Sequence, residues 1–88
     1  MFTVRFNADA EKDLVLLHKK APHALTKLAK LLDELKEHPR SGTGQCEQLK
    51  HYKEETWSRR ITKEHRLVYR IYDDIVEVLV ISAFGHYN

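Results

Sequence analysis

The fold is decided by residues 56–84, TWSRRITKEHRLVYRIYDDIVEVLVISAF. Apolar residues alternate with polar ones in Thr56–Ile61 and in Arg66–Tyr72, which is the period-two pattern of half-buried strands. Ile75–Phe84 is a nearly continuous apolar run rich in Ile and Val, typical of a central strand buried on both faces. Because the connections between them are short, these three strands are predicted to pair antiparallel.

The preceding residues are predicted to add two helices and two short strands. Phe2–Phe6 shows the same alternation, and Asn7 is a suitable cap for a helix over Ala8–Lys20. A second helix is expected over Pro22–His38, since proline suits a first helical position and leucines follow at helical spacing. Cys46–Lys50 is a short candidate strand beyond a glycine-containing loop. The order β-α-α-β-β-β-β predicts an α+β fold, with a two-helix hairpin packed on one face of a small, mostly antiparallel β-sheet.

Length and composition indicate a single domain over residues 1–88. The chain is 42% apolar and 32% charged, which is ordinary globular composition rather than that of a disordered segment. No apolar run approaches the roughly 20 residues that a membrane span needs. The single cysteine, Cys46, excludes an internal disulfide framework. We therefore expect a cytoplasmic domain with no membrane partner.

The net charge of +2 hides a basic middle third. Residues 36–70 hold nine Lys and Arg against five Asp and Glu. Strand alternation places Arg60 and Arg66 on the sheet face away from the helices, with Lys50 on a neighbouring strand. Arginine suits a phosphate because its planar fork donates two hydrogen bonds and stays charged. The charges by themselves leave two interpretations open, a solvated strand face and a surface that binds a polyanion.

The other face of the same strands is predicted to point toward the helices. Leu67, Tyr69 and Ile71 share this face in one strand. In the strand before it, one side holds Trp57, Arg59 and Ile61, and its apolar members Trp57 and Ile61 indicate that this is the apolar side.

The histidines are not predicted to form a metal site. Their positions give no pair at i,i+4 helical spacing and no cluster with cysteine. We expect no metal and no other cofactor. A nucleophilic role for Cys46 is not favoured either, because no base is identifiable near it. The six histidines are His18, His23, His38, His51, His65 and His86.

Three segments form a distinctive pattern, LKH…WSRRITxEHRLVY…HY. They are Glu47–His51, Thr56–Tyr69 and the final His86-Tyr87. This pattern resembles the YoeB (Txe) branch of the RelE/ParE toxin superfamily, whereas the N-terminal half resembles it only in its strand–helix–helix order. The resemblance implies a RelE-like fold and the toxin of a bacterial type II toxin–antitoxin pair. Such toxins are endoribonucleases that cut messenger RNA in the ribosomal A site and need no metal.

The implied chemistry assigns a role to each of several residues. Cleaving RNA without a metal needs a base for the neighbouring 2′-hydroxyl, cations for the phosphorane and an acid for the leaving 5′-oxygen. By position, the resemblance makes Glu47 the general base and Arg66 the transition-state arginine. It makes His86 the general acid, or the group that holds the scissile phosphate, with Tyr87 orienting the substrate. The candidate residues are Glu47, Arg66, His86 and Tyr87 for catalysis, and Lys50, Arg59 and Arg60 for binding RNA phosphates.

The sequence departs from the branch at two positions. Phe84 stands where many members have a basic residue, and Asn88 follows the tyrosine at which many members end. Neither change touches the implied chemistry, but the first is expected to weaken one RNA contact.

Two other functions stay open on the same scaffold. The ParE branch inhibits DNA gyrase by protein contact alone, and a plain RNA-binding module would retain RNA without cutting it. The set Glu47, Arg66 and His86 distinguishes the nuclease from the gyrase inhibitor, which does not need it, and cleavage itself distinguishes it from the RNA-binding module. Expected partners are a cognate antitoxin, with an acidic segment that folds on binding, and the ribosome with its messenger RNA. A homodimer is also considered, and DNA is expected only indirectly, through the antitoxin.

Overall fold

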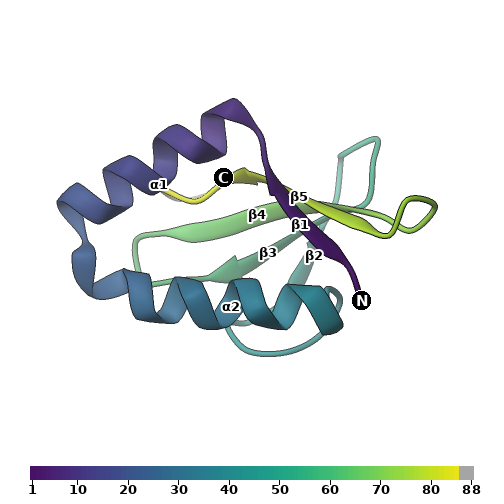
Figure 1. Ribbon diagram of the computed structural model, residues 1–88, viewed down its shortest axis with the longest axis horizontal. Coiled ribbons are helices and arrows are strands. Elements are labelled where there is room, and N and C mark those ends of the chain that lie inside the picture. Colours follow the sequence, from purple (N-terminus) through teal and green to yellow (C-terminus); the bar gives the residue numbers. More distant parts are fainter. Residues whose placement is uncertain (86–88) are drawn as a thin grey trace.

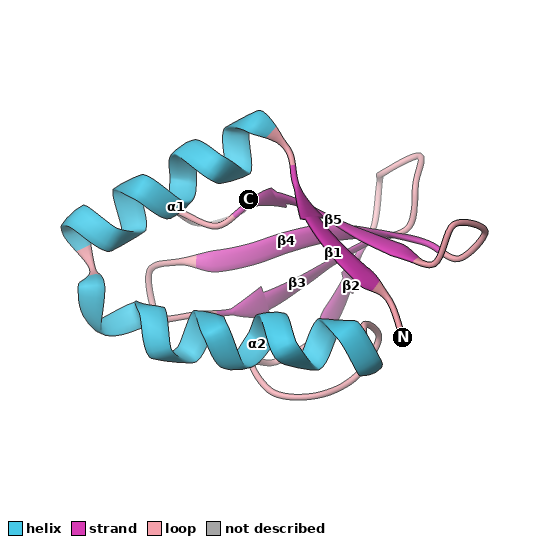
Figure 2. Cartoon of the chain, in the orientation of Figure 1, coloured by secondary structure: helices cyan, strands magenta, loops and turns pink. Residues whose placement is uncertain are grey.

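The computed structural model describes residues 1–85, which form a layer of helices on a layer of sheet (Figure 1). The helices are α1 (Ala8–Lys20) and α2 (Leu25–Glu37), joined by a 3₁₀ turn, η1 (Pro22–Ala24). Figure 2 shows the two helices as a hairpin on one side of the strands. The strands are β1 (Thr3–Phe6), β2 (Glu47–Leu49), β3 (Thr56–Arg60), β4 (Arg66–Tyr72) and β5 (Glu77–Ser82). The predicted α+β fold is confirmed.

The five strands form one sheet in the order β1-β5-β4-β3-β2. The pairs β2–β3, β3–β4 and β4–β5 are antiparallel, as the short connections predict. β1 pairs parallel with β5, with Thr3 opposite Glu77 and Phe6 opposite Val80. The first and last strands of the chain are therefore neighbours, and the sheet is mostly antiparallel.

Local signals place both helices close to their predicted bounds. The side chain of Asn7 caps α1 by accepting a hydrogen bond from the backbone N–H of Ala10 at 2.8 Å. The helix then runs over Ala8–Lys20, as predicted. The second predicted helix starts with the η1 turn at Pro22, and α2 itself begins at Leu25. Short 3₁₀ turns are frequent at helix N-termini, so this difference is local.

The core lies between the helices and one face of the sheet. Leu67, Tyr69 and Ile71 of β4 are all buried in it, which confirms the face predicted for them. Alternate residues of β5, Val78 and Val80, are fully buried in the same core. The helices contribute chiefly Ala10, Leu17, Leu28, Leu31 and Leu35.

The last predicted strand is shorter and less buried than its apolar sequence indicated. Ile75 and Val76 belong to the turn that precedes β5, where their exposed fractions are 59% and 45%. Within β5, buried Val78 and Val80 alternate with half-buried Leu79 and Ile81, so only one face is fully covered. Hydrophobicity alone therefore overstated both the length of this strand and the burial of its second face.

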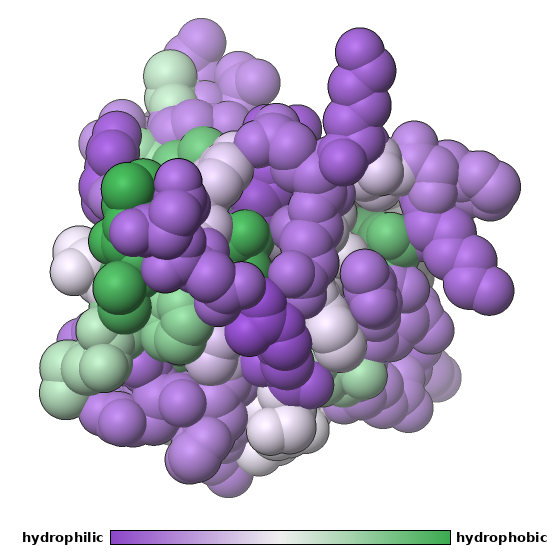
Figure 3. Space-filling model, turned by 90° about the vertical axis from the view of Figure 1, so that its right-hand side faces the viewer, coloured by the Kyte–Doolittle hydropathy of each residue, from purple (hydrophilic) through white to green (hydrophobic). Residues whose placement is uncertain are grey.

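The surface at the end of the sheet is mostly hydrophilic, and its apolar area gathers mainly at one side (Figure 3). Neither helix of the described chain combines the length and apolar character that crossing a membrane requires.

Candidate active site

The face of the sheet that points away from the helices brings together three of the predicted site residues. Residues directly opposite each other on paired strands share a face. Glu47 of β2 is opposite Ser58 of β3, and Arg60 of β3 is opposite Arg66 of β4. Because Leu67 points into the core, its neighbour Arg66 points away from it. We call this surface of β2, β3 and β4 the open face.

The geometry of the open face sets a carboxylate beside two cations. Positions two residues apart along a strand are separated by about 6.5 Å, so the row that holds Glu47 adjoins the row that holds Arg60 and Arg66. Glu47 is exposed, while both arginines are partly buried. A base and a pair of guanidinium groups can therefore reach the same small anion from neighbouring positions.

The open face carries polar atoms that lack hydrogen-bond partners. Within residues 1–85, three buried side-chain atoms have none: Ser58 Oγ, Arg60 Nε and Arg70 Nε. All three lie on β3 and β4, and the strand register places them on the same face as Glu47. Buried donors without acceptors are rare in folded proteins, and ordered solvent or a ligand commonly satisfies them.

Arg59 does not belong to this surface, which corrects its assignment as a phosphate-binding residue. Its side chain is fully buried on the helix side of β3, as strand alternation indicated. Arg59 Nε donates to the Tyr69 hydroxyl at 3.0 Å and Nη1 to Glu34 Oε1 at 2.8 Å. Nη2 donates to the backbone carbonyls of His38 and Ser41. Four of its five N–H donors are bonded inside the protein and its side chain is fully buried, so Arg59 is not accessible to RNA.

Buried Arg59 and Tyr69 and partly exposed Glu34 form a hydrogen-bonded cluster, here called the Arg59 cluster, that holds the loop before β2. Glu34 accepts hydrogen bonds from the backbone and the hydroxyl of Thr43, at 2.8 and 2.7 Å. These bonds, together with the charge of Arg59, hold the pKa of Glu34 below its ordinary value. Tyr69 donates to the carbonyl of Pro39 at 2.7 Å, and burial raises the pKa of its hydroxyl. The loop runs from residue 38 to residue 46, so the cluster fixes the chain that delivers Glu47.

A second set of contacts holds the end of the described chain beside Arg66. The backbone N–H of Arg66 donates to the Gly85 carbonyl at 3.1 Å. The N–H of Gly85 donates to Nδ1 of His65 at 2.9 Å, and the His65 ring stacks on Phe84 with centroids 4.4 Å apart. Gly85 has a φ of +86°, a conformation that glycine adopts without strain.

The predicted residues His86 and Tyr87 lie outside the described residues. The residue that sequence analysis missed on this side is His65, which was considered only as a metal ligand. Nothing in its spacing marks it, because its role depends on Gly85, twenty positions later in the chain.

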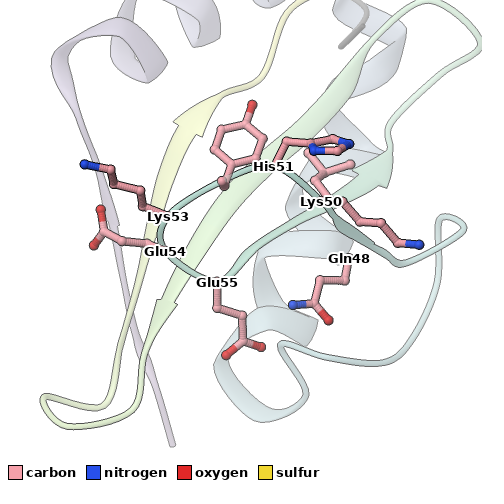
Figure 4. A pocket seen from close by; sticks show the side chains of 8 residues that line it. Gln48, Lys50, His51, Lys53, Glu54 and Glu55 are labelled. Carbon is pink, nitrogen blue, oxygen red and sulfur yellow. The ribbon is translucent and has the colours of Figure 1, made fainter.

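Lys50 lies just beyond β2, at the start of a loop that encloses a cavity of about 500 Å³. Figure 4 shows the Lys50 and Lys53 side chains on opposite sides of this loop. The lining is strongly polar, and Lys50 itself is exposed. The cavity is lined by Gln48, Leu49, Lys50, His51, Tyr52, Lys53, Glu54 and Glu55.

Residues 1–85 contain no cluster of side chains that could bind a metal ion. No group of three or more His, Cys, Asp or Glu side chains lies close enough there to hold an ion.

Comparison with known proteins gives a consistent result. A family model described as the YoeB-like toxin of bacterial type II toxin–antitoxin systems matches residues 6–87. The toxin YoeB of Mycobacterium bovis is 38% identical over 87 residues, which cover 99% of this chain and 100% of that protein.

Solved structures agree with the sequence relatives. A YoeB/ParE toxin from Agrobacterium tumefaciens superimposes with a TM-score of 0.87 at 30% identity, covering 98% of this chain and 100% of that one. The YoeB dimer from Staphylococcus aureus gives 0.82 at 28% identity over 98% of each chain. The YoeB-YefM complex from the same species gives 0.79 at 28% identity over 99% of each chain.

Proposed function

Because this chain belongs to the YoeB-like toxin family of bacterial type II toxin–antitoxin systems, we propose that it is an endoribonuclease that cuts messenger RNA in the ribosomal A site. The toxin role follows from the family. The observation that supports the chemistry is the open face, where Glu47 adjoins the pair Arg60 and Arg66. A gyrase inhibitor that acts by protein contact has no need of a base next to two phosphate-binding arginines.

In the proposed reaction, Glu47 takes the proton of the 2′-hydroxyl beside the scissile phosphate. The 2′-oxygen attacks phosphorus, and the bond from phosphorus to the 5′-oxygen breaks. The products are a 2′,3′-cyclic phosphate and a 5′-hydroxyl end. DNA would not be cleaved, because it lacks the 2′-hydroxyl that acts as the nucleophile.

The cations act on the transition state and His86 acts on the leaving group. Arg66, with Arg60, stabilises the extra negative charge of the phosphorane by charge-assisted hydrogen bonds. His86 returns a proton to the leaving 5′-oxygen, and Tyr87 orients the substrate, as the family resemblance implies. Lys50 adds an exposed charge at the rim, and no step requires a metal.

The natural partner that silences the open face is an antitoxin. YoeB of S. aureus is found in a complex with YefM and also as a dimer, so we assign both kinds of partner to this chain. An acidic segment that folds on binding would complement the arginines of the open face. Contact with DNA would then be indirect, through the antitoxin, and the site of action would be the cytoplasm, where ribosomes translate.

The function is tested with translating ribosomes by mapping messenger 5′ ends with primer extension. Wild-type protein should give cuts in codon register, and Glu47→Gln should reduce cleavage by about 10²–10⁴ because it keeps the shape and removes the base. Glu37→Gln, which removes an exposed carboxylate at the end of α2, is the matched control. Absence of cuts together with inhibited DNA supercoiling would replace this proposal with a ParE-like one.

A further inference from the structure

The open face holds an arginine that the proposed chemistry does not use. Arg70 lies on β4 four residues after Arg66, and the alternation of the strand puts both on the same face. The rise of a strand separates them by about 13 Å, which is longer than the step between neighbouring phosphates in a nucleic acid chain. Arg70 therefore reaches a part of an RNA strand that Arg66 does not.

The guanidinium of Arg70 is incompletely satisfied inside the protein. Its Nε is buried and has no hydrogen-bond partner. Its Nη1 lies 3.7 Å from Glu54 Oε1, which is too long for a hydrogen bond. The Glu54 side chain is half exposed, so moving it away costs little. Tyr72 neighbours both groups, and its hydrogen bond to Glu54 is the main reason why the pKa of Tyr72 is raised.

We propose that Arg70 is a second phosphate-binding position, which takes the RNA backbone at a nucleotide away from the scissile one. In the free protein the Glu54 carboxylate occupies the position of that phosphate, and it moves away when RNA binds. A phosphate suits the position better than a single carboxylate oxygen because its several oxygens can accept more than one hydrogen bond from the planar guanidinium, which stays charged. The inference rests on the proposed function, since it extends the path of the same RNA along β4.

The choice of RNA over an acidic protein segment comes from the row to which Arg70 belongs. Arg66 and Arg70 stand on one strand and one face, with Val68 between them. Two cations about 13 Å apart on one face of a strand can bind two phosphates of the same RNA backbone. A protein segment would instead place its carboxylates at irregular intervals.

The test uses single-stranded RNA with a 2′-O-methyl group at the scissile nucleotide, so that binding is measured without cleavage. Arg70→Gln should weaken binding about tenfold and reduce the slope of log affinity against log salt by about 0.7, the value for one lost contact on a single strand. The RNA affinity of Arg70→Lys should lie between those of wild-type protein and Arg70→Gln, because lysine keeps the positive charge but lacks the planar pair of donors. Lys12→Gln, on exposed α1, controls for net charge and should leave the slope unchanged.

The Glu54→Gln variant tests whether Glu54 competes with the RNA phosphate for Arg70. It should raise RNA affinity, because it removes the competitor of the phosphate. If the two residues only stabilised each other, both variants would lower the melting temperature and neither would change the RNA affinity.

A scan of single methylphosphonate substitutions locates the contact. For wild-type protein, a methylphosphonate at the scissile phosphate or at one separate phosphate should weaken RNA binding. For Arg70→Gln, the substitution should still weaken binding at the scissile phosphate but no longer at the separate one. Equal scans for both proteins would overturn the inference while leaving the nuclease intact. An unchanged scan with a weakened antitoxin complex would reassign Arg70 to the antitoxin. If wild-type protein also cut no messenger RNA on translating ribosomes, the proposed function would fall as well.

Discussion

Arg59 and Arg60 are adjacent in the sequence and differ in almost every physical respect. Arg59 is fully buried and bonded to Tyr69, Glu34 and two carbonyls, whereas Arg60 lies on the open face with its Nε unpartnered. The period of two in a strand is sufficient to separate them. A buried arginine is stable only when its partners are supplied, and here they come from α2, the loop after it and β4.

Substitution should separate the roles of these two arginines. Arg59→Gln should lower the free energy of unfolding by about 3–5 kcal/mol, because it leaves the partners of a buried charge unsatisfied. Arg60→Gln should change stability little and weaken the binding of RNA. Both predictions are checked by measuring urea unfolding and RNA binding for each variant. Equal stability of the two proteins would show that the Arg59 cluster contributes nothing.

The Glu34 carboxylate predicts how stability depends on pH. Its pKa in the folded protein is below the ordinary value of 4.5, so the unfolded chain binds its proton more readily than the folded one. The stabilisation is therefore present above about pH 5 and is lost as the pH falls through the lowered folded pKa.

Unfolding midpoints measured between about pH 7 and pH 3 check this prediction. Glu34→Gln should show a smaller loss at low pH than wild-type protein, and Glu37→Gln should resemble the wild type. Parallel curves for the Glu34 variant and the wild type would contradict it.

At the scale of elements, the two ends of the candidate site are held by different anchors. The Arg59 cluster fixes the loop before β2, and His65 fixes the chain after β5 through Gly85. Asp13 of α1 adds a third tie by accepting a hydrogen bond from the backbone N–H of Ala83 at 3.0 Å. The helix layer is thus connected to the chain on both sides of the open face.

Deleting residues 86–88 tests the function of the terminal residues. Because residues at a chain end beyond a glycine break usually contribute little to stability, the melting temperature should move little. Cleavage on ribosomes should fall by about 10²–10⁴, the usual range for a lost general acid, and His86→Ala should reproduce most of the loss. Single-turnover cleavage beside a melting curve measures both. Retained cleavage would leave the arginines of the open face to explain catalysis.

The helices and strands were predictable where a local signal fixes them. Asn7 and Pro22 bound α1, and the alternation in β4 sorts Leu67 from Arg66. The parallel pairing of β1 with β5 was not predictable, because a period-two pattern does not say which strand lies next to it. The Arg59 cluster was missed for a similar reason, since Glu34 is 25 residues away and only the fold brings it near.

At the scale of the whole molecule, one side carries the helices and core and the other carries the candidate chemistry. An open face on a small sheet has few groups with which to splay and align a flexible RNA strand. The ribosome, which already holds the messenger in a fixed path, can supply that alignment.

Cleavage of naked RNA should therefore be slow compared with cleavage on ribosomes. The two rates are measured on the same messenger, free and in a translating complex, with Glu47→Gln as the blank for contaminating nuclease. Equal rates would mean that the protein aligns the strand without help.

The pairing of β1 with β5 also governs when the protein becomes complete. β5 is the last strand to be synthesised, and it stands between β1 and the β4 strand that carries Arg66. While β5 is still inside the ribosome, the first strand has no partner and the open face lacks its inner neighbour. We therefore expect a chain whose β5 has not yet emerged to lack the paired sheet on which the proposed cleavage depends. The interval between release and folding is the time in which an antitoxin already present can capture the new toxin.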